Sequence, residues 1–249
     1  MTSALVVTHS ASETVGRLGE WLPEAGMELV LCEPWAGDEV PADLGDHDAL
    51  VVMGGPQQAY DDSSAPWLRA TKDLLRSAVA AGAPVLGVCL GHQLLAEATG
   101  GRVARGEAPE LGARLVAKRD AAADDPVFGP VPFTPTVVQW HSDGVVDLPP
   151  GALLLAGSPR YPVQAFRVGD RAYGVQFHPE PTREHLETWA ARSGEELDLL
   201  GLSGDDVVER AVAALEEVEE VWRPAVQRWA RLAEHPASPP RRLLPVVDA

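Results

Sequence analysis

The chain has few cysteines, few positive charges and no long apolar run. Two cysteines in 249 residues do not make a disulfide framework. No apolar stretch approaches the length that spans a bilayer, and residues 1–4 lack the basic region that begins a secretory signal. These absences exclude a disulfide-rich secreted scaffold and predict a cytoplasmic protein.

Acidic residues outnumber basic ones. The chain has 37 Asp and Glu against 20 Lys and Arg, which gives a formal net charge of −17. Such an acidic chain repels nucleic acid and anionic membrane surfaces, so we expect neither as a partner. The cysteines and histidines lack the spacing of a zinc site, and we expect no metal and no cofactor.

The first half of the chain alternates short apolar runs with helical patterns, which indicates an α/β fold. Strands are expected at residues 4–8, 28–32, 49–53 and 85–88. They are continuous apolar runs, as is typical of parallel strands buried on both faces. Helices are expected from an N-cap at Ser12 to Glu20, and over residues 66–81. We predict a mostly parallel central sheet with helices on both faces.

The second half contains successive strand patterns, and we expect part of this region to add antiparallel strands to the sheet. They lie at residues 113–118, 136–140, 153–156, 164–168 and 172–177. Helices should follow at 182–191 and from about 204 to 233, where Pro224 could break the second helix. We divide the chain into one domain (1–195), a C-terminal helical extension (196–235) and a tail (236–249). The extension could pack on the core or form the face of a homodimer.

Cys89 lies between an apolar strand and a helical pattern, in the stretch GVCLGHQ. Gly-x-Cys-x-Gly is the cysteine form of a nucleophile elbow, in which small neighbours accommodate a strained backbone. The start of the next helix favours a thiolate. The amide of Leu90 can donate to an oxyanion, and the amide of Gly55, after the third strand, is the best second donor. A small buried hydrophobe is the alternative for any cysteine, and we adopt it for Cys32.

A thiolate nucleophile needs a proton shuttle, usually a histidine oriented by a carboxylate or amide. His178 ends an apolar strand, and Glu180 lies close enough to bond the ring nitrogen that faces away from the sulfur. His141 is expected either at the pocket rim or in a structural role. The other histidines are predicted to be structural (His9 and His92) or at the surface (His47, His185 and His235).

These residues resemble the class I, triad-type glutamine amidotransferases. Four separated stretches carry the resemblance: VVMGGPQ (51–57), GVCLGHQLLAEATGG (87–101), QWHSDGVVDLP (139–149) and YGVQFHPEPT (173–182). Among subfamilies, the chain looks most like the stand-alone amidotransferases related to the glutaminase domain of GMP synthase. The resemblance covers about residues 4–192 and implies a flavodoxin-like architecture.

The resemblance also implies a mechanism. Cys89 would attack the side-chain amide of glutamine, while the Gly55 and Leu90 amides hold the oxyanion. His178, oriented by Glu180, would protonate the departing ammonia, and water would then release glutamate from a γ-glutamyl thioester. The resemblance implies that Gln93 and a loop of Ser142, Asp143 and Gly144 bind the substrate, and we expect Gly54 and His141 to belong to the same substrate-binding site. Residues 57–60 match the family poorly and are expected to border the pocket.

The chain contains neither a Gly-x-x-x-x-Gly-Lys-Ser/Thr loop nor an SGGxDS-type ATP-binding loop. Three interpretations follow. An amidotransferase or glutaminase would supply ammonia to a separate synthetase or acceptor. A stand-alone hydrolase or transferase would act on a γ-glutamyl amide or a specialised metabolite. A regulatory or binding module would have no need of Cys89, His178 and Glu180 together, which argues against the third interpretation.

Overall fold

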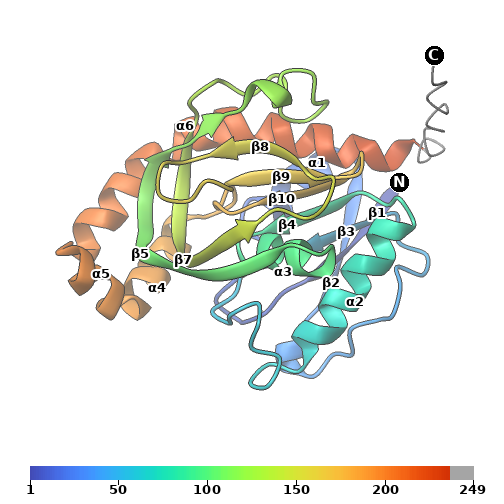
Figure 1. The fold of residues 1–249 in the computed structure, drawn as a ribbon, viewed down its shortest axis with the longest axis horizontal. Coiled ribbons are helices and arrows are strands. Elements are labelled where there is room, and N and C mark those ends of the chain that lie inside the picture. The colour runs from blue at the N-terminus through green and yellow to red at the C-terminus, as the bar shows by residue number, and fades with distance from the viewer. Residues whose placement is uncertain (236–249) are drawn as a thin grey trace, which may run out of the picture.

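The computed structural model describes residues 1–235 of the chain. A sheet of eight strands lies at the centre of this part (Figure 1). In spatial order the strands are β2 (Met27–Cys32), β1 (Thr2–Val7), β3 (Ala49–Val52), β4 (Val85–Val88), β10 (Ala172–Val175), β9 (Ala165–Val168), β8 (Leu153–Gly157) and β6 (Ala117–Lys118). The first five are parallel, and the remaining pairings are antiparallel. The mostly parallel sheet with antiparallel additions is confirmed. The tail predicted at 236–249 lies outside the described residues.

Alternate residues of the buried strands face two separate cores. In β1, Ala4 and Val6 pack into one core, and Leu5 and Val7 pack into the other. The first core contains apolar residues of α1 (Leu18–Glu24), α4 (Arg183–Arg192) and α6 (Gly204–Ala230); the second contains those of α2 (Trp67–Ala80) and α3 (Leu90–Ala98). Because successive side chains of a strand point to opposite faces, continuous apolar runs require this double cover. Helices on both faces are therefore confirmed.

The predicted helix from Ser12 to Glu20 starts too early. Arg17, not Ser12, is the N-cap of α1, and residues 8–17 form a loop. The backbone N–H of Arg17 donates to the carbonyl oxygen of Glu180 at 2.9 Å. Gly16 has a φ of +50°, and a Cβ there would lie 2.3 Å from the same oxygen. Packing of this loop against the segment after β10 outweighs the local preference for a helix.

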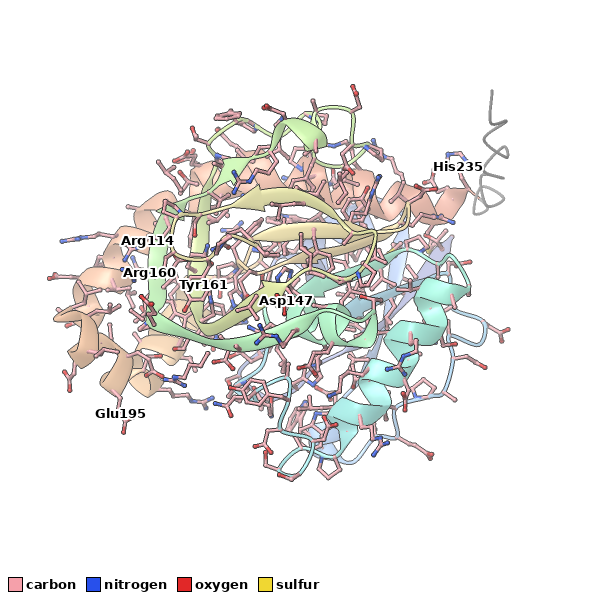
Figure 2. The ribbon with its side chains drawn as sticks, in the orientation of Figure 1. Arg114, Asp147, Arg160, Tyr161, Glu195 and His235 are labelled. Atoms are coloured by element: carbon pink, nitrogen blue, oxygen red, sulfur yellow. The ribbon has the colours of Figure 1, made fainter. Side chains whose placement is uncertain are left out.

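The expected strand at 113–118 is divided between two sheets. β5 (Arg102–Leu115) pairs with β7 (Thr136–Asp147) in a separate antiparallel ribbon, and only β6 joins the central sheet. The start of β5, RVARGE, is too polar for a strand covered on both faces. Figure 2 shows Tyr161 beside this ribbon, where its hydroxyl lies 2.8 Å from the carbonyl oxygen of Ala108 and 2.9 Å from that of Ser142. β5 and β7 therefore form a second, two-stranded sheet that is separate from the central sheet.

The C-terminal helix α6 packs on the core and continues through Pro224. Pro224 is exposed, whereas Trp222 and Trp229 on the opposite side are buried. The indole N–H of Trp229 donates to the carbonyl oxygen of Val85 at 3.1 Å. Burial on both sides of the proline offsets its cost of about 3 kcal/mol in a helix interior, so the break we allowed for does not occur.

A further helix, α5 (Gly194–Leu200), lies between α4 and α6 and has no counterpart in the expected elements. The boundary predicted at residue 195 falls inside it, and the division into domain and extension stays a prediction. Among residues 1–235, none of the helices is both long enough and apolar enough to cross a membrane.

Candidate active site

Cys89 occupies the corner between β4 and α3 in a strained conformation. Its φ of 50° is the only positive φ of a non-glycine residue within residues 1–235. Its backbone N–H donates to the carbonyl oxygen of Val175 in β10 at 2.9 Å, which ties the corner to the sheet. A Cβ on Gly87 would lie 2.5 Å from the Gly91 carbonyl oxygen, and one on Gly91 would lie 2.0 Å from that of Val52. The two glycines are thus required by close backbone contacts.

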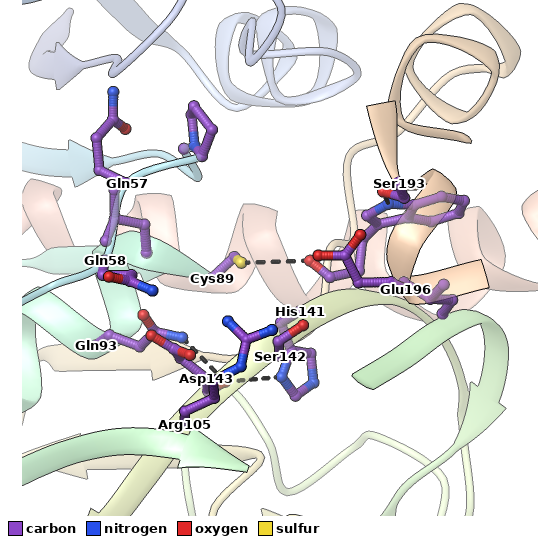
Figure 3. Close-up of a pocket in the computed structure, with 15 residues that line it drawn as sticks. Gln57, Gln58, Cys89, Gln93, Arg105, His141, Ser142, Asp143, Ser193 and Glu196 are labelled. Atoms are coloured by element: carbon purple, nitrogen blue, oxygen red, sulfur yellow. Dashed lines mark hydrogen bonds between the residues drawn. The ribbon is translucent and has the colours of Figure 1, made fainter. Parts of the chain in front are cut away.

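The sulfur of Cys89 contacts one glutamine side chain and a backbone carbonyl oxygen, and Figure 3 marks the second contact. The side-chain amide of Gln176 lies 3.7 Å from Cys89 Sγ, and the sulfur lies 3.9 Å from the carbonyl oxygen of Trp140. Gln93 donates to the side-chain oxygen of Gln176 at 3.2 Å and to the backbone oxygen of Asp143 at 3.1 Å. Gln93 therefore joins the helix that follows the cysteine to the β5–β7 ribbon. Gln176 was not predicted, although it stands in the YGVQFHPE stretch.

His178 and Glu180 form a buried pair after β10. His178 Nδ1 lies 2.7 Å from a carboxylate oxygen of Glu180, and both residues are 2% exposed. The ring of Trp189 packs against the imidazole at 4.5 Å between centroids. Burial alone lowers the pKa of His178, but the charges of Glu180 and Cys89 and the hydrogen bond to Glu180 outweigh it. The pKa of His178 is therefore held well above its ordinary value.

A pocket of about 180 Å³ opens beside the sulfur, between the carboxyl ends of β3 and β4, the β5–β7 ribbon and α5. The predicted residues that line it are Gly55, Cys89, Leu90, Gln93, His141, Ser142 and Asp143. Gln57 and Gln58 also line it, as expected for the stretch 57–60. His141 Nδ1 lies 2.8 Å from the carbonyl oxygen of Asp143, so these two pocket residues are in direct contact.

Two predicted glycines lie close to the site, but not on the pocket wall. A Cβ on Gly54 would lie 3.0 Å from His178 Cε1, and one on Gly144 would lie 2.6 Å from the ring of Tyr161. The segment 142–144, expected as a loop, belongs to β7, because it pairs with the start of β5. Paired backbone gives this wall of the pocket a more rigid form than a loop would have.

Charged residues that the sequence did not single out also line the pocket. Arg105 comes from β5 and Glu196 from α5, whereas Asp143 was among the predicted residues (Figure 3). One carboxylate oxygen of Asp143, Oδ2, is buried and has no hydrogen-bond partner among the described residues. A cation and carboxylates around one cavity suit a ligand that carries both charges. Neither Arg105 nor Glu196 stands in a motif, so no local signal could have identified them.

The other histidines lie away from the sulfur or serve packing. His9 and His92, predicted as structural, are fully buried, and burial lowers the pKa of each to about 3. His185, predicted at the surface, is buried at the start of α4. Its Nε2 lies 2.8 Å from the hydroxyl of Thr14, and its Nδ1 contacts Thr182 in a capping box. The loop that precedes α1 therefore covers this residue. Within residues 1–235, no group of three or more His, Cys, Asp or Glu side chains is placed to hold a metal ion.

Comparison with known proteins identifies the family. The model for "Glutamine amidotransferase class-I" matches residues 23–189. The chain belongs to the class I glutamine amidotransferases. Solved structures of glutamine amidotransferases from Thermotoga maritima and Methylobacillus flagellatus share its fold, with TM-scores of 0.81 and 0.84 and 26% identity each. They cover 92% and 98% of this chain, and the matches take in 98% and 100% of those chains. The predicted flavodoxin-like amidotransferase architecture is confirmed.

The amidotransferase relatives carry more than one kind of name. The glutamine amidotransferase-like protein YfeJ of Salmonella typhimurium is 33% identical over 77% of this chain and 81% of its own length. Gamma-glutamyl peptidase 5 of Arabidopsis thaliana is 30% identical over 78% of this chain and 74% of its own length. A GMP synthase of Porphyromonas gingivalis is 29% identical over 82% of this chain, which spans only 38% of that protein. The family makes the chain an enzyme of the hydrolase type, and these names leave its substrate open.

Proposed function

We propose that the protein hydrolyses the side-chain amide of glutamine through a γ-glutamyl thioester on Cys89 and supplies ammonia to a separate acceptor. The observation that carries this proposal is the position of Cys89. It forms part of the wall of a pocket lined by charged residues, and it shares a second, smaller cavity with His178, whose imidazole is paired with Glu180.

The charged residues of the pocket would bind the amino-acid end of glutamine. The free carboxylate oxygen of Asp143 would accept a hydrogen bond from the α-amino group, and Arg105 would pair with the α-carboxylate. Gln93 lines the pocket and donates a hydrogen bond to the backbone oxygen of Asp143, which holds Asp143 in place. These contacts would fix the amide carbon close to Cys89, which supplies orientation as well as affinity.

In the first half-reaction the thiolate of Cys89 attacks the amide carbon, and a tetrahedral oxyanion forms. The backbone N–H groups of Gly55 and Leu90 would donate to this oxygen. A Cβ on Gly55 would lie 2.8 Å from the Leu90 side chain, so the two segments are in contact. The carbon–nitrogen bond then breaks, the nitrogen takes the proton of His178, and ammonia leaves. The raised pKa of His178 favours the protonated ring from which this step starts.

In the second half-reaction water replaces ammonia. His178, now neutral, takes a proton from the water as the oxygen attacks the thioester carbon. The carbon–sulfur bond breaks, glutamate leaves, and the thiolate is restored beside a protonated ring. Glu180 keeps the ring oriented through the 2.7 Å contact at Nδ1, which leaves Nε2 for the reacting groups.

The use of the ammonia is a separate part of the proposal. The match to the relative named GMP synthase covers 38% of that protein. It supports a role beside a synthetase, and we propose that a separate synthetase or acceptor takes up the ammonia. The relative named gamma-glutamyl peptidase supports a second candidate, in which the same thioester forms from a larger γ-glutamyl amide.

The test combines turnover with labelling of the nucleophile. The purified chain is incubated with glutamine, and glutamate and ammonia are measured. A parallel sample receives a glutamine analogue with a diazoketone in place of the amide, and labelled peptides are mapped by mass spectrometry. We expect label on Cys89 and none on Cys32, which lies at the end of β2 outside the pocket and has a thiol pKa raised by burial. Absence of both turnover and label would favour a binding module without glutaminase activity.

A second prediction concerns the proton shuttle. His178→Gln keeps a polar side chain of similar size but cannot transfer a proton, so we expect kcat for glutamine to fall by about 10²- to 10⁴-fold. His47→Gln serves as the matched control, because His47 is half-buried and lines neither cavity at the sulfur, and it should keep the parental rate. Steady-state glutamate release decides the matter. A His178→Gln rate within a few-fold of the parent would remove His178 from the mechanism.

A further inference from the structure

A second carboxyl group lies at the nucleophile, and none of the recognised motifs contains it. Glu13 belongs to the loop between β1 and α1. A Cβ built on Gly54 would lie 3.0 Å from His178 Cε1, 3.5 Å from Glu13 Oε2 and 3.6 Å from Cys89 Cβ. The three side chains therefore converge around Gly54, with the carboxyl group of Glu13 beside the ring that handles the proton.

Two cavities meet at the sulfur, and Glu13 lies on one of them. The main pocket is lined by the charged residues described above and includes neither His178 nor Glu13. A second, smaller cavity is lined by Glu13, Gly55, Cys89, Trp140, His178 and Trp189. Gly55, Cys89 and Trp140 belong to both walls. On one side of the sulfur lies the main pocket, which would hold the γ-glutamyl group, and on the other side lies the smaller cavity lined by His178.

The chemistry assigns the leaving group to the His178 side. When the carbon–nitrogen bond breaks, the departing nitrogen must take its proton from His178. The nitrogen, and whatever is attached to it, must therefore face the cavity that His178 lines. Glu13 is an ionisable group of that cavity that takes no part in the proposed proton transfers.

The loop that carries Glu13 is fastened on both sides of it. Ser12 accepts a hydrogen bond from the guanidinium of Arg192 in α4, and the hydroxyl of Thr14 lies 2.8 Å from His185 Nε2. Arg17 N–H donates to the Glu180 carbonyl oxygen at 2.9 Å. These contacts fix the backbone of Glu13 against the segment that carries the catalytic pair, so its carboxyl group is held at the cavity.

We propose that Glu13 is a specificity-determining residue for the leaving group: it admits ammonia and uncharged amines and disfavours amines that carry a carboxylate, such as the amino acid of a γ-glutamyl dipeptide. The inference rests on the proposed thioester chemistry. It distinguishes between the two candidate substrates, because hydrolysis of a γ-glutamyl dipeptide would place a second negative charge beside Glu13.

The effect should depend on pH. Burial raises the pKa of Glu13 to about 7; of the charges that face it, Glu180 raises the pKa and His178 and Arg192 lower it. Above that pH Glu13 is charged and repels a carboxylate, and below it the neutral group does not. Discrimination should therefore increase as the pH rises through about 7.

The experiment compares γ-glutamylglycine with γ-glutamylglycinamide, which have nearly the same shape and differ by one charge. The ratio of their kcat/KM values cancels the titrations of Cys89 and His178, because both substrates use them. We expect the parent to favour the amide, and the preference to grow about tenfold between about pH 6 and about pH 8. In Glu13→Gln the ratio should be smaller than in the parent and independent of pH, and any remaining preference reflects the different basicity of the two leaving amines. Glu20→Gln, on an exposed residue of α1, should behave as the parent.

Glutamine is measured beside both compounds to separate the possible failures. Equal ratios in the parent and Glu13→Gln would overturn the inference, as would a Glu13→Gln variant that hydrolyses glutamine but neither glycine compound. Either result would leave the proposed function in place. No glutamate from any substrate would overturn the proposed function and this inference together. Loss of folding in the variant would lower all three rates in parallel and could not change the ratio.

Discussion

Cys89→Ala is expected to lower glutamate release from glutamine by about 10⁴-fold or more and to leave the fold almost unchanged. The variant removes the sulfur that would form the thioester, and no other nucleophile replaces it. Alanine occupies the same strained corner at the same conformational cost, since both residues carry a Cβ at φ 50°. The residue is 6% exposed, so the change opens only a small gap in the core. Activity and stability should thus separate cleanly.

Three measurements check this prediction. Glutamate release should disappear, thermal unfolding should stay within a few degrees of the parent, and glutamine should still raise the melting temperature of the variant. Cys32→Ala is the matched control, because that cysteine lies at the end of β2 and away from the pocket, and it should keep full activity. Persisting turnover in Cys89→Ala would show that another group attacks the amide.

Gly91→Ala is expected to destabilise the fold by about 3 kcal/mol or more. The new Cβ would lie 2.0 Å from the carbonyl oxygen of Val52 and 2.7 Å from its carbonyl carbon. These are backbone atoms of β3, a fully buried strand in the middle of the sheet, so they cannot turn away as a side chain could. Either β3 or the start of α3 must move, and both moves disturb the corner that holds Cys89.

The measurement is thermal or denaturant unfolding of the purified variant. For a chain of this size the loss corresponds to a fall in melting temperature of roughly 6–12 °C. Gly194→Ala is the control, because a Cβ at that position meets nothing within 4 Å and α5 gains a better helix former. A Gly91→Ala variant as stable as the control would mean that β4 and α3 approach β3 less closely than the structure shows.

Local sequence patterns were sufficient to predict a structural feature where the residues that define it lie in one short stretch. The parallel strands read as continuous apolar runs because each is covered on both faces, as Ala4 and Leu5 show by packing into different cores. The cysteine corner was predictable for a similar reason. Its glycines relieve contacts between β3, β4 and α3, which are required wherever this turn is made, so Gly87 and Gly91 stand next to the residue they serve.

Local preference failed where distant segments compete for the same residues. Ser12 looks like a helix cap, but its loop is held in an irregular form by Arg192 and by the backbone of Glu180. Pro224 looks like a break, but buried side chains on both sides of it keep α6 continuous. For the loop at Ser12, the deciding contacts come from residues more than a hundred positions away in the sequence. For Pro224, they come from the buried face of the whole helix.

The sequence by itself determined the α/β class and the family, and it singled out Cys89, His178 and Glu180 as candidates, because each stands in a contiguous stretch whose spacing carries the signal. Only the tertiary structure decided what surrounds them. Arg105, Glu196 and Glu13 come from the ribbon, from α5 and from the first loop, and they share no motif. A pocket is formed by segments that folding brings together, and the charge it offers a ligand depends on distances that no stretch of sequence contains.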